Sequence, residues 1–500
     1  MNPLAACSSL LLAALLGAVA PAAQALAASA PCPFRVADGL SVSCGQLELP
    51  ASRSERTLRR IQLFYARVAA AHDSGLEPLL VLTGGPGIGA SQLLESGPTA
   101  LLAVQATREL IFVDQRGTGR SLPDLRCPDM DPVALYHDSL SADEVQACLK
   151  RLREQGFRTA WFDTQESAQD LQALRQHLGI QRWALHGTSY GTVLALELLR
   201  RDAAAVSALV LISPTQANAY LLEPDALGNI GAVWRRIFVD CAAQPECARA
   251  YPDLQGRFLS LAAHLTRQPL HFTFKDPRSG QPRRAQMGMA QLLAVLNGVV
   301  GSEGNGVLAP ALIDYMERVA SGRSRQDDDK LAQLYLPPGS AQAAASTAPG
   351  LNLSITCREA RPRHDEPALL RVASAFEPYA YADDAQQYSL ACPLWQAGDA
   401  AASLYQAPRS AVPTLLLTGD YDTLAGSYHA ARLQGGLSRS QLLSIRGAGH
   451  DVTQGNACAS AAVVSFLAAP LTPLAAPCLR LAAPPAFQVF DFGAPPATGR

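Results

Sequence analysis

Hydrophobic positions in the first half of the chain alternate between short apolar runs and helical patterns. Almost uninterrupted apolar runs lie within residues 77–87, 108–121, 183–191 and 208–213. Such runs are typical of strands that are buried on both faces. Residues 163–180 instead place apolar side chains at helical spacing after a polar start. This alternation predicts an α/β fold with a mostly parallel sheet and helices on both of its faces.

The alternation stops near residue 216 and resumes after residue 405. The segment between carries helical patterns, such as ALGNIGAVWRRIFVDCA, joined by connectors rich in Pro, Gly and Ala. We therefore expect a mainly helical cap inserted into the sheet domain. The predicted divisions are a leader at 1–27, a first sheet part at 28–215, the cap at 216–405, and a second sheet part with a tail at 406–500.

The leader prediction rests on residues 8–20, an apolar run that is too short to span a bilayer. A run of this length fits the central region of a signal peptide, and A-x-A sites follow at Ala25 and Ala27. The segment MNP before it lacks the usual Lys or Arg. We expect export to the periplasm or the medium, with no membrane span in the mature chain.

Cysteine usage agrees with export. The chain has eleven cysteines, and removal of Cys7 with the leader leaves an even ten. Because an even number in an exported chain indicates disulfides and short loops close easily, we expect successive local pairs. The expected pairs are Cys32–Cys44, Cys127–Cys148, Cys241–Cys247, Cys357–Cys392 and Cys458–Cys478. No metal site is expected, since the sequence contains neither C-x-x-C nor H-E-x-x-H.

Charge gives no indication of a polyanionic partner. The formal net charge of the 500 residues is −2, and the arginines are spread along the chain without a dense basic block. Nucleic acid and acidic membrane surfaces are therefore not expected as partners. The sequence carries no indication of the oligomeric state.

A serine stands between two glycines where the third run gives way to a helical pattern. The segment GTSYG at 187–191 fits the strand–turn–helix elbow that exposes a nucleophilic serine, here Ser189. Serine needs a base, and in this arrangement an acid and then a histidine follow along the chain. Asp422 and His450 each follow a later apolar run in that order, with Asp420 as the alternative acid. The backbone N–H groups of Tyr190 and Gly85, or of Gly84 in place of Gly85, are the expected oxyanion-hole donors.

Several segments together resemble one family. GGPG (84–87), DQRGTGRS (114–121), GTSYG (187–191), GDYD (419–422) and GAGH (447–450) resemble the proline iminopeptidase-type serine peptidases of the α/β-hydrolase superfamily. The likeness is strongest to the exported branch that includes tripeptidyl aminopeptidases.

This resemblance implies an α/β-hydrolase fold, a helical cap over the site, and release of residues from free peptide N-termini without a cofactor. It implies that Arg116 forms a buried ion pair. It also makes Glu359 a candidate to hold the substrate ammonium group, although the sequence alone favours the alternative of a plain surface carboxylate. Thr83 departs from the family, where histidine commonly precedes the two glycines.

Three other functions fit parts of the sequence. An esterase could use the same fold and triad, because triad chemistry does not separate esters from amides. A dinucleotide-binding oxidoreductase is suggested by GPGIGA at 85–90, but Pro86 removes a backbone N–H from that loop. A binding protein without catalysis would not need all three triad residues. The preferred N-terminal residue and the peptide length are not indicated.

Overall fold

The computed structural model describes most of the chain after residue 30. The described ranges are 31–36, 39–97, 99–137, 140–217, 224–302, 304–359, 378–379, 383–475 and 484–492. The predicted leader at 1–27 lies outside them and stays a prediction.

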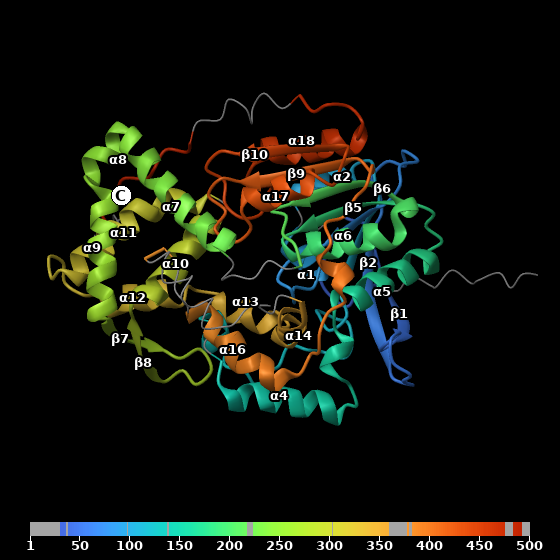
Figure 1. The fold of residues 1–500 in the computed structure, drawn as a ribbon, viewed down its shortest axis with the longest axis horizontal. Coiled ribbons are helices and arrows are strands. Elements are labelled where there is room, and N and C mark those ends of the chain that lie inside the picture. Colours follow the sequence, from blue (N-terminus) through green and yellow to red (C-terminus); the bar gives the residue numbers. More distant parts are fainter. Residues whose placement is uncertain are drawn as a thin grey trace, which may run out of the picture.

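One eight-stranded sheet, in the order β1-β2-β4-β3-β5-β6-β9-β10, forms the domain on the right of Figure 1. β1 pairs antiparallel with β2 and β2 antiparallel with β4, and every later neighbour is parallel. The strands are β1 (Val42–Pro50), β2 (Arg60–Val68), β3 (Leu79–Leu82), β4 (Leu110–Asp114), β5 (Trp183–Thr188), β6 (Val206–Ile212), β9 (Thr414–Gly419) and β10 (Ser440–Ile445). Every residue of β3, β4 and β9 is buried, as the apolar runs predict for strands covered on both faces.

Helices cover both faces of this sheet. Side chains of α5 (Thr164–His177), α6 (Tyr190–Asp202) and α17 (Ser427–Gln434) share one apolar cluster with Leu185 of β5. Those of α1 (Ser91–Ser96), α2 (Thr99–Gln105) and α18 (Ala457–Ala468) share another with the adjacent Ala184. Successive residues of a strand point to opposite faces, so the two clusters lie on opposite sides of the sheet. The predicted fold class is confirmed.

The inserted segment contains a helical unit with its own core, on the left of Figure 1. Its helices are α7 (Pro224–Ala243), α8 (Pro245–Ala250), α9 (Leu254–Arg267), α10 (Met289–Gly301), α11 (Ala309–Ala320) and α12 (Asp328–Tyr335). The sequence did not predict the antiparallel hairpin of β7 (Leu270–Lys275) and β8 (Pro282–Met287) within it.

A second group of helices lies below the sheet domain in Figure 1. It comprises α13 (Ser340–Ser346), α14 (Pro349–Glu359) and α16 (Asp383–Trp395), together with α3 (Pro132–Tyr136) and α4 (Ala142–Glu154) from the loop after β4. Single 3₁₀ turns occur at Thr159–Trp161, Ala203–Ala205, Asn305–Leu308 and Ala402–Tyr405. Thus α3 and α4, which belong to the predicted first sheet part, pack with helices of the predicted cap. The predicted domain limits at residues 216 and 405 therefore stay a prediction.

Four of the five expected cysteine pairs are disulfides. They join Cys32 to Cys44, Cys127 to Cys148, Cys241 to Cys247, and Cys357 to Cys392. The pair Cys458–Cys478 includes a residue outside the described ranges and stays a prediction. No helix in the described part of the chain is both long and apolar enough to cross a membrane.

Candidate active site

Ser189 occupies a strained turn between β5 and α6. Its φ of 56° and ψ of −125° place a non-glycine residue in a sparsely populated region, which costs on the order of 1–3 kcal/mol. Hydrogen bonds on both sides hold the turn. The Ser189 N–H donates to Ile212 O at 3.0 Å, and the Thr192 N–H donates to Ser189 O at 2.9 Å.

The flanking glycines are needed because backbone approaches them closely. A Cβ added to Gly187 would lie 2.6 Å from the carbonyl oxygen of Gly191. A Cβ added to Gly191 would lie 2.8 Å from the carbonyl oxygen of Thr83, at the end of β3. Ordinary contacts of a Cβ begin at 3.4 Å, so side chains at these positions would force the helix away from the sheet.

The late sheet strands bring an imidazole and a carboxylate together. His450 Nδ1 lies 3.0 and 3.1 Å from the two carboxylate oxygens of Asp422. Asp422 is fully buried, and its Oδ1 also accepts from the N–H groups of Leu424 and Ala425 at 2.9 and 2.8 Å. These bonds fix the carboxylate where it can orient the ring and favour the tautomer with hydrogen on Nδ1.

Opposing effects act on the His450 ring. Burial lowers the pKa of His450, but the charge and hydrogen bond of Asp422 outweigh it, so the pKa is raised above its ordinary value. The loop that carries the ring packs on the end of α10, where the His450 N–H donates to Gly301 O at 2.6 Å. The cap therefore helps to position this histidine.

Asp420, the alternative acid, has other partners. Its Oδ1 accepts from the N–H of Gly447, and its Oδ2 lies 3.6 Å from both Arg236 and Arg446. It joins the two loops that follow β9 and β10, and among the described interactions it makes no contact with His450. The structure thus brings Asp422, and not Asp420, to the histidine.

Ser189 and His450 line the same cavity, which has a volume of about 610 Å³. Within the described residues, no hydrogen bond yet joins the two side chains. Such contacts are often loose in the absence of substrate and tighten when substrate binds. The arrangement thus brings the components of a nucleophile–base pair to one cavity.

The loop of Gly84, Gly85 and Pro86 lies directly against the serine. A Cβ on Gly84 would lie 2.9 Å from Ser189 Cβ, and Gly85 has a φ of +106° that favours glycine. Thr83, which replaces the family histidine, donates its hydroxyl to Ile88 O at 2.7 Å and so closes the loop. Gly85, Ser189 and Tyr190 all line a second cavity of about 270 Å³.

Glu359 also lines this second cavity and is only 2% exposed, so the alternative of a surface carboxylate is wrong. Its two carboxylate oxygens accept from the backbone N–H and the hydroxyl of Thr164, at 2.7 and 2.6 Å. The Thr164 hydroxyl lies 2.8 Å from the Tyr190 hydroxyl. Burial, with a contribution from the charge of Asp163, raises the pKa of Glu359 to about 8.

Other residues of the second cavity were not found from the sequence. Asn352, Ile355 and Thr356 line it with Glu359, and their spacing of three, four and seven residues marks one face of α14. Tyr388 of α16 lines it too and donates to Asn352 Oδ1 at 3.2 Å. The helical spacing of these residues within LNLSITCRE (351–359) was the available signal.

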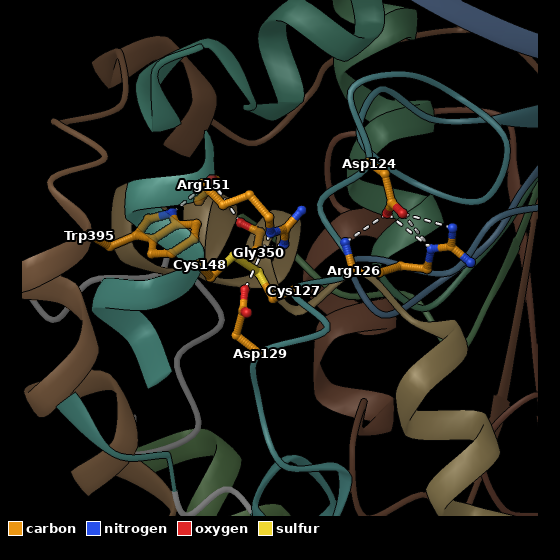
Figure 2. The surroundings of a disulfide bond; sticks show 9 residues. Asp124, Arg126, Cys127, Asp129, Cys148, Arg151, Gly350 and Trp395 are labelled. Atoms are coloured by element: carbon orange, nitrogen blue, oxygen red, sulfur yellow. Dashed lines mark hydrogen bonds and ion pairs between the residues drawn. A yellow bond between two sulfur atoms is a disulfide. The ribbon is translucent and has the colours of Figure 1, made fainter. Parts of the chain in front are cut away.

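Two disulfides lie at the two ends of α14. Figure 2 shows the Cys127–Cys148 bridge beside Gly350. A Cβ on Gly350 would lie 2.9 Å from Cys127 Sγ, and the Gly350 N–H donates to Leu125 O at 3.0 Å. The Cys357–Cys392 bridge ties the other end of α14 to α16. The face of α14 that lines the cavity is therefore held from both ends.

Arg116 supports the site from beneath. It is fully buried, and its guanidinium makes two hydrogen bonds of 2.7 Å to the carboxylate of Asp170 on α5. This agrees with the ion pair that the family resemblance implies. Such a bidentate pair fixes the turn after β4 rather than contacting substrate.

Comparisons with known proteins agree with this geometry. Residues 77–290 match the family described as alpha/beta hydrolase fold, and residues 377–478 match the family described as TAP-like protein. The chain thus has the α/β-hydrolase fold. The resemblance to the proline iminopeptidase and TAP-type members of the α/β-hydrolase superfamily is confirmed by these matches together with the relatives that follow.

Individual relatives carry proline iminopeptidase names. A probable proline iminopeptidase of Streptomyces coelicolor is 31% identical over 202 residues, covering 35% of this chain and 53% of the relative. The proline iminopeptidase of Xanthomonas citri is 25% identical over 239 residues, covering 48% and 58%. The chain thus spans about half the length of the curated relatives it matches. The solved proline iminopeptidase of Mycobacterium smegmatis is 14% identical over 85% of this chain and 98% of that chain, with a TM-score of 0.40.

Proposed function

We propose that the protein is a serine aminopeptidase that hydrolyses peptide bonds near free N-termini, releasing proline or tripeptides. One observation carries this proposal most strongly. The strained Ser189 shares a cavity with an imidazole whose Nδ1 lies 3.0 Å from a fully buried carboxylate. Side chains far apart in sequence thereby supply a nucleophile, a base and an orienting acid.

The proposed reaction is acyl transfer. Ser189 attacks the scissile carbonyl while His450 takes its proton, and Asp422 stabilises the imidazolium that forms. The N–H groups of Tyr190 and Gly85 stabilise the oxyanion. His450 then protonates the leaving amine, and water hydrolyses the acyl-enzyme to complete the cycle. No step in this scheme requires a metal or an organic cofactor.

Glu359 is the proposed receptor for the substrate ammonium group. It lines the smaller cavity together with Ser189 and with Tyr190, whose N–H is a proposed oxyanion-hole donor. An ammonium beside a buried carboxylate lowers the pKa of that carboxylate and so ionises Glu359 as substrate binds. N-acetylated peptides would lose this interaction.

Export is part of the proposal. The leader pattern at 1–27 and the four disulfides are compatible with a protein that matures in an oxidising compartment, either the periplasm or the medium.

The test measures how fast the purified protein turns over a panel of matched substrates. These are proline- and tripeptide-nitroanilides, their N-acetylated forms, and simple nitrophenyl esters. We expect steady turnover of the free-amine amides, with kcat/KM lowered at least tenfold by acetylation. Fast turnover of esters with none of the amides would show an esterase instead.

A further inference from the structure

Two cavities meet at the candidate nucleophile, and their linings differ. Ser189, Gly85 and Leu424 line both. Glu359 and Tyr190 belong to the lining of the smaller cavity only, and His450 to that of the larger cavity only. The two cavities therefore extend from Ser189 toward different groups, the smaller toward Glu359 and the larger toward His450.

Apolar side chains dominate the larger cavity. It extends to the sheet face covered by α1 and α2, and six aliphatic side chains line it: Val81, Leu82, Ile88, Leu93, Leu101 and Leu424. Its volume of about 610 Å³ falls within the range of about 300–1,000 Å³ that is usual for pockets that bury small ligands.

Asp451 gives the larger cavity a negative edge. Its two carboxylate oxygens accept from Thr453 Oγ1 and Gln454 Nε2, each at 2.8 Å. Neither Lys nor Arg occurs among the described residues that line the cavity. A second carboxylate entering it would therefore meet like charge without a compensating cation.

His186 adds one polar position to the apolar wall. It lies on β5, is 6% exposed, and its Nδ1 has no hydrogen-bond partner in the described structure. Burial lowers the pKa of His186, although the charge of Asp451 opposes this, so the ring stays neutral. A buried ring nitrogen without a partner is costly, and a ligand amide would supply the missing hydrogen bond.

We propose that the larger cavity binds the leaving portion of the substrate and selects an apolar residue directly after the scissile bond. This rests on the proposed function. His450 must protonate the leaving nitrogen, which places the leaving amine on the side of the histidine. The acyl part, with its ammonium, then occupies the side of Glu359. A free carboxylate on the residue after the scissile bond is disfavoured, because it would approach Asp451.

The test holds the acyl residue constant, using the best one from the nitroanilide panel, and varies the next residue X through Gly, Ala, Leu and Phe in C-terminal amides. Burial of a Leu or Phe side chain predicts a kcat/KM roughly tenfold to a hundredfold above that for Gly. The same peptides with a free C-terminal carboxylate on residue X should be poorer substrates than the corresponding amides.

A substitution in the larger cavity distinguishes a specific effect on substrate preference from a general effect on the protein. Leu93→Trp fills the larger cavity from α1 and should reduce the advantage of Leu and Phe over Gly. The matched control is Leu102→Trp on α2, where the parent side chain is 38% exposed and does not line the cavity. This variant should keep the parental order of substrates.

Product inhibition on the unaltered protein gives a second measurement, independent of whether the variant folds. Phenylalanine amide should inhibit more strongly than glycine amide. Peptide turnover with no preference for apolar X, or equal inhibition by the two amides, would overturn the subsite while leaving the aminopeptidase proposal intact. Absence of turnover for every free-amine peptide would overturn both.

Discussion

Gly191, in the first turn of α6, packs closely against the backbone at the end of β3. An added methyl group would lie 2.8 Å from the carbonyl oxygen of Thr83 and nearer still to that of Leu82. Both contacts are with backbone, which cannot rotate aside. Gly191→Ala therefore forces α6 away from the end of β3, where the loop that carries Gly85 begins.

The size of the effect follows from the distances. Ordinary contacts of a Cβ begin at 3.4 Å, and the added methyl group would lie 2.8 Å from the Thr83 carbonyl oxygen. The two backbones must therefore separate by at least 0.6 Å. Overpacking of this kind costs about 1–3 kcal/mol of stability. Ser189 on the helix side and Gly85 on the loop side also move apart. Because misplacement by about 1 Å can cost 10²-fold, we expect kcat/KM to fall by about tenfold to a hundredfold.

The assay measures thermal unfolding and kcat/KM on the best nitroanilide for Gly191→Ala and for a matched control. The control is Gly298→Ala in α10, where an added Cβ meets nothing within 4 Å. It should gain about 0.5–1 kcal/mol of stability and keep its activity. A Gly191→Ala protein with parental stability and parental kcat/KM would refute the close approach of helix and loop.

Three further predictions concern titratable groups. Asp422→Asn should lower kcat by about 10³–10⁴-fold, whereas Asp420→Asn should leave most of the activity, as measured by initial rates. The kcat/KM of the unaltered protein should fall with decreasing pH through a midpoint above 6.5, because His450 must be neutral to act as a base and its pKa is raised. Glu359 has a folded-state pKa of about 8 against an ordinary 4.5, so the parent should lose stability between these pH values as pH rises. In pH-dependent denaturation, Glu359→Gln should lack this loss, and its kcat/KM for free-amine peptides should be lower.

Each of these three predictions has an outcome that would contradict it. Equal losses in the Asp422 and Asp420 variants would indicate general damage to the loop. An acid midpoint below 6.5 would contradict the stabilised imidazolium. Parallel stability curves for the parent and the Glu359 variant would show that the carboxyl is ionised at little cost in the folded protein.

The strands and the order of the candidate triad residues could be predicted from the sequence because they depend on local pattern. Uninterrupted apolar runs marked the buried strands, and the turns that follow them marked Ser189, Asp422 and His450. The choice of Asp422 over Asp420 needed only its depth in the loop. The paired cysteines were accessible for a similar reason, since each described bridge closes a local loop of 6 to 35 residues.

Other features depend on contacts between distant segments. Glu359 is buried because Thr164, 195 positions earlier, satisfies both carboxylate oxygens, and no local pattern indicates this. The hairpin of β7 and β8 was missed because its alternation, as in LHFTFK, is short and lies among long helical patterns. The two cavities arise where the loops after β3, β5, β9 and β10 meet α1, α2 and α14, so their shapes follow from packing alone.

Covalent labelling of the nucleophile tests the central claim most directly. Purified protein is treated with a fluorophosphonate probe, and the adduct is mapped by peptide mass spectrometry for the parent, Ser189→Ala and His450→Ala. We predict one adduct per chain on Ser189, none on the Ser189 variant, and strongly slowed labelling of the His450 variant. An adduct on another residue, or an unlabelled parent that is folded, would contradict a serine nucleophile activated by His450.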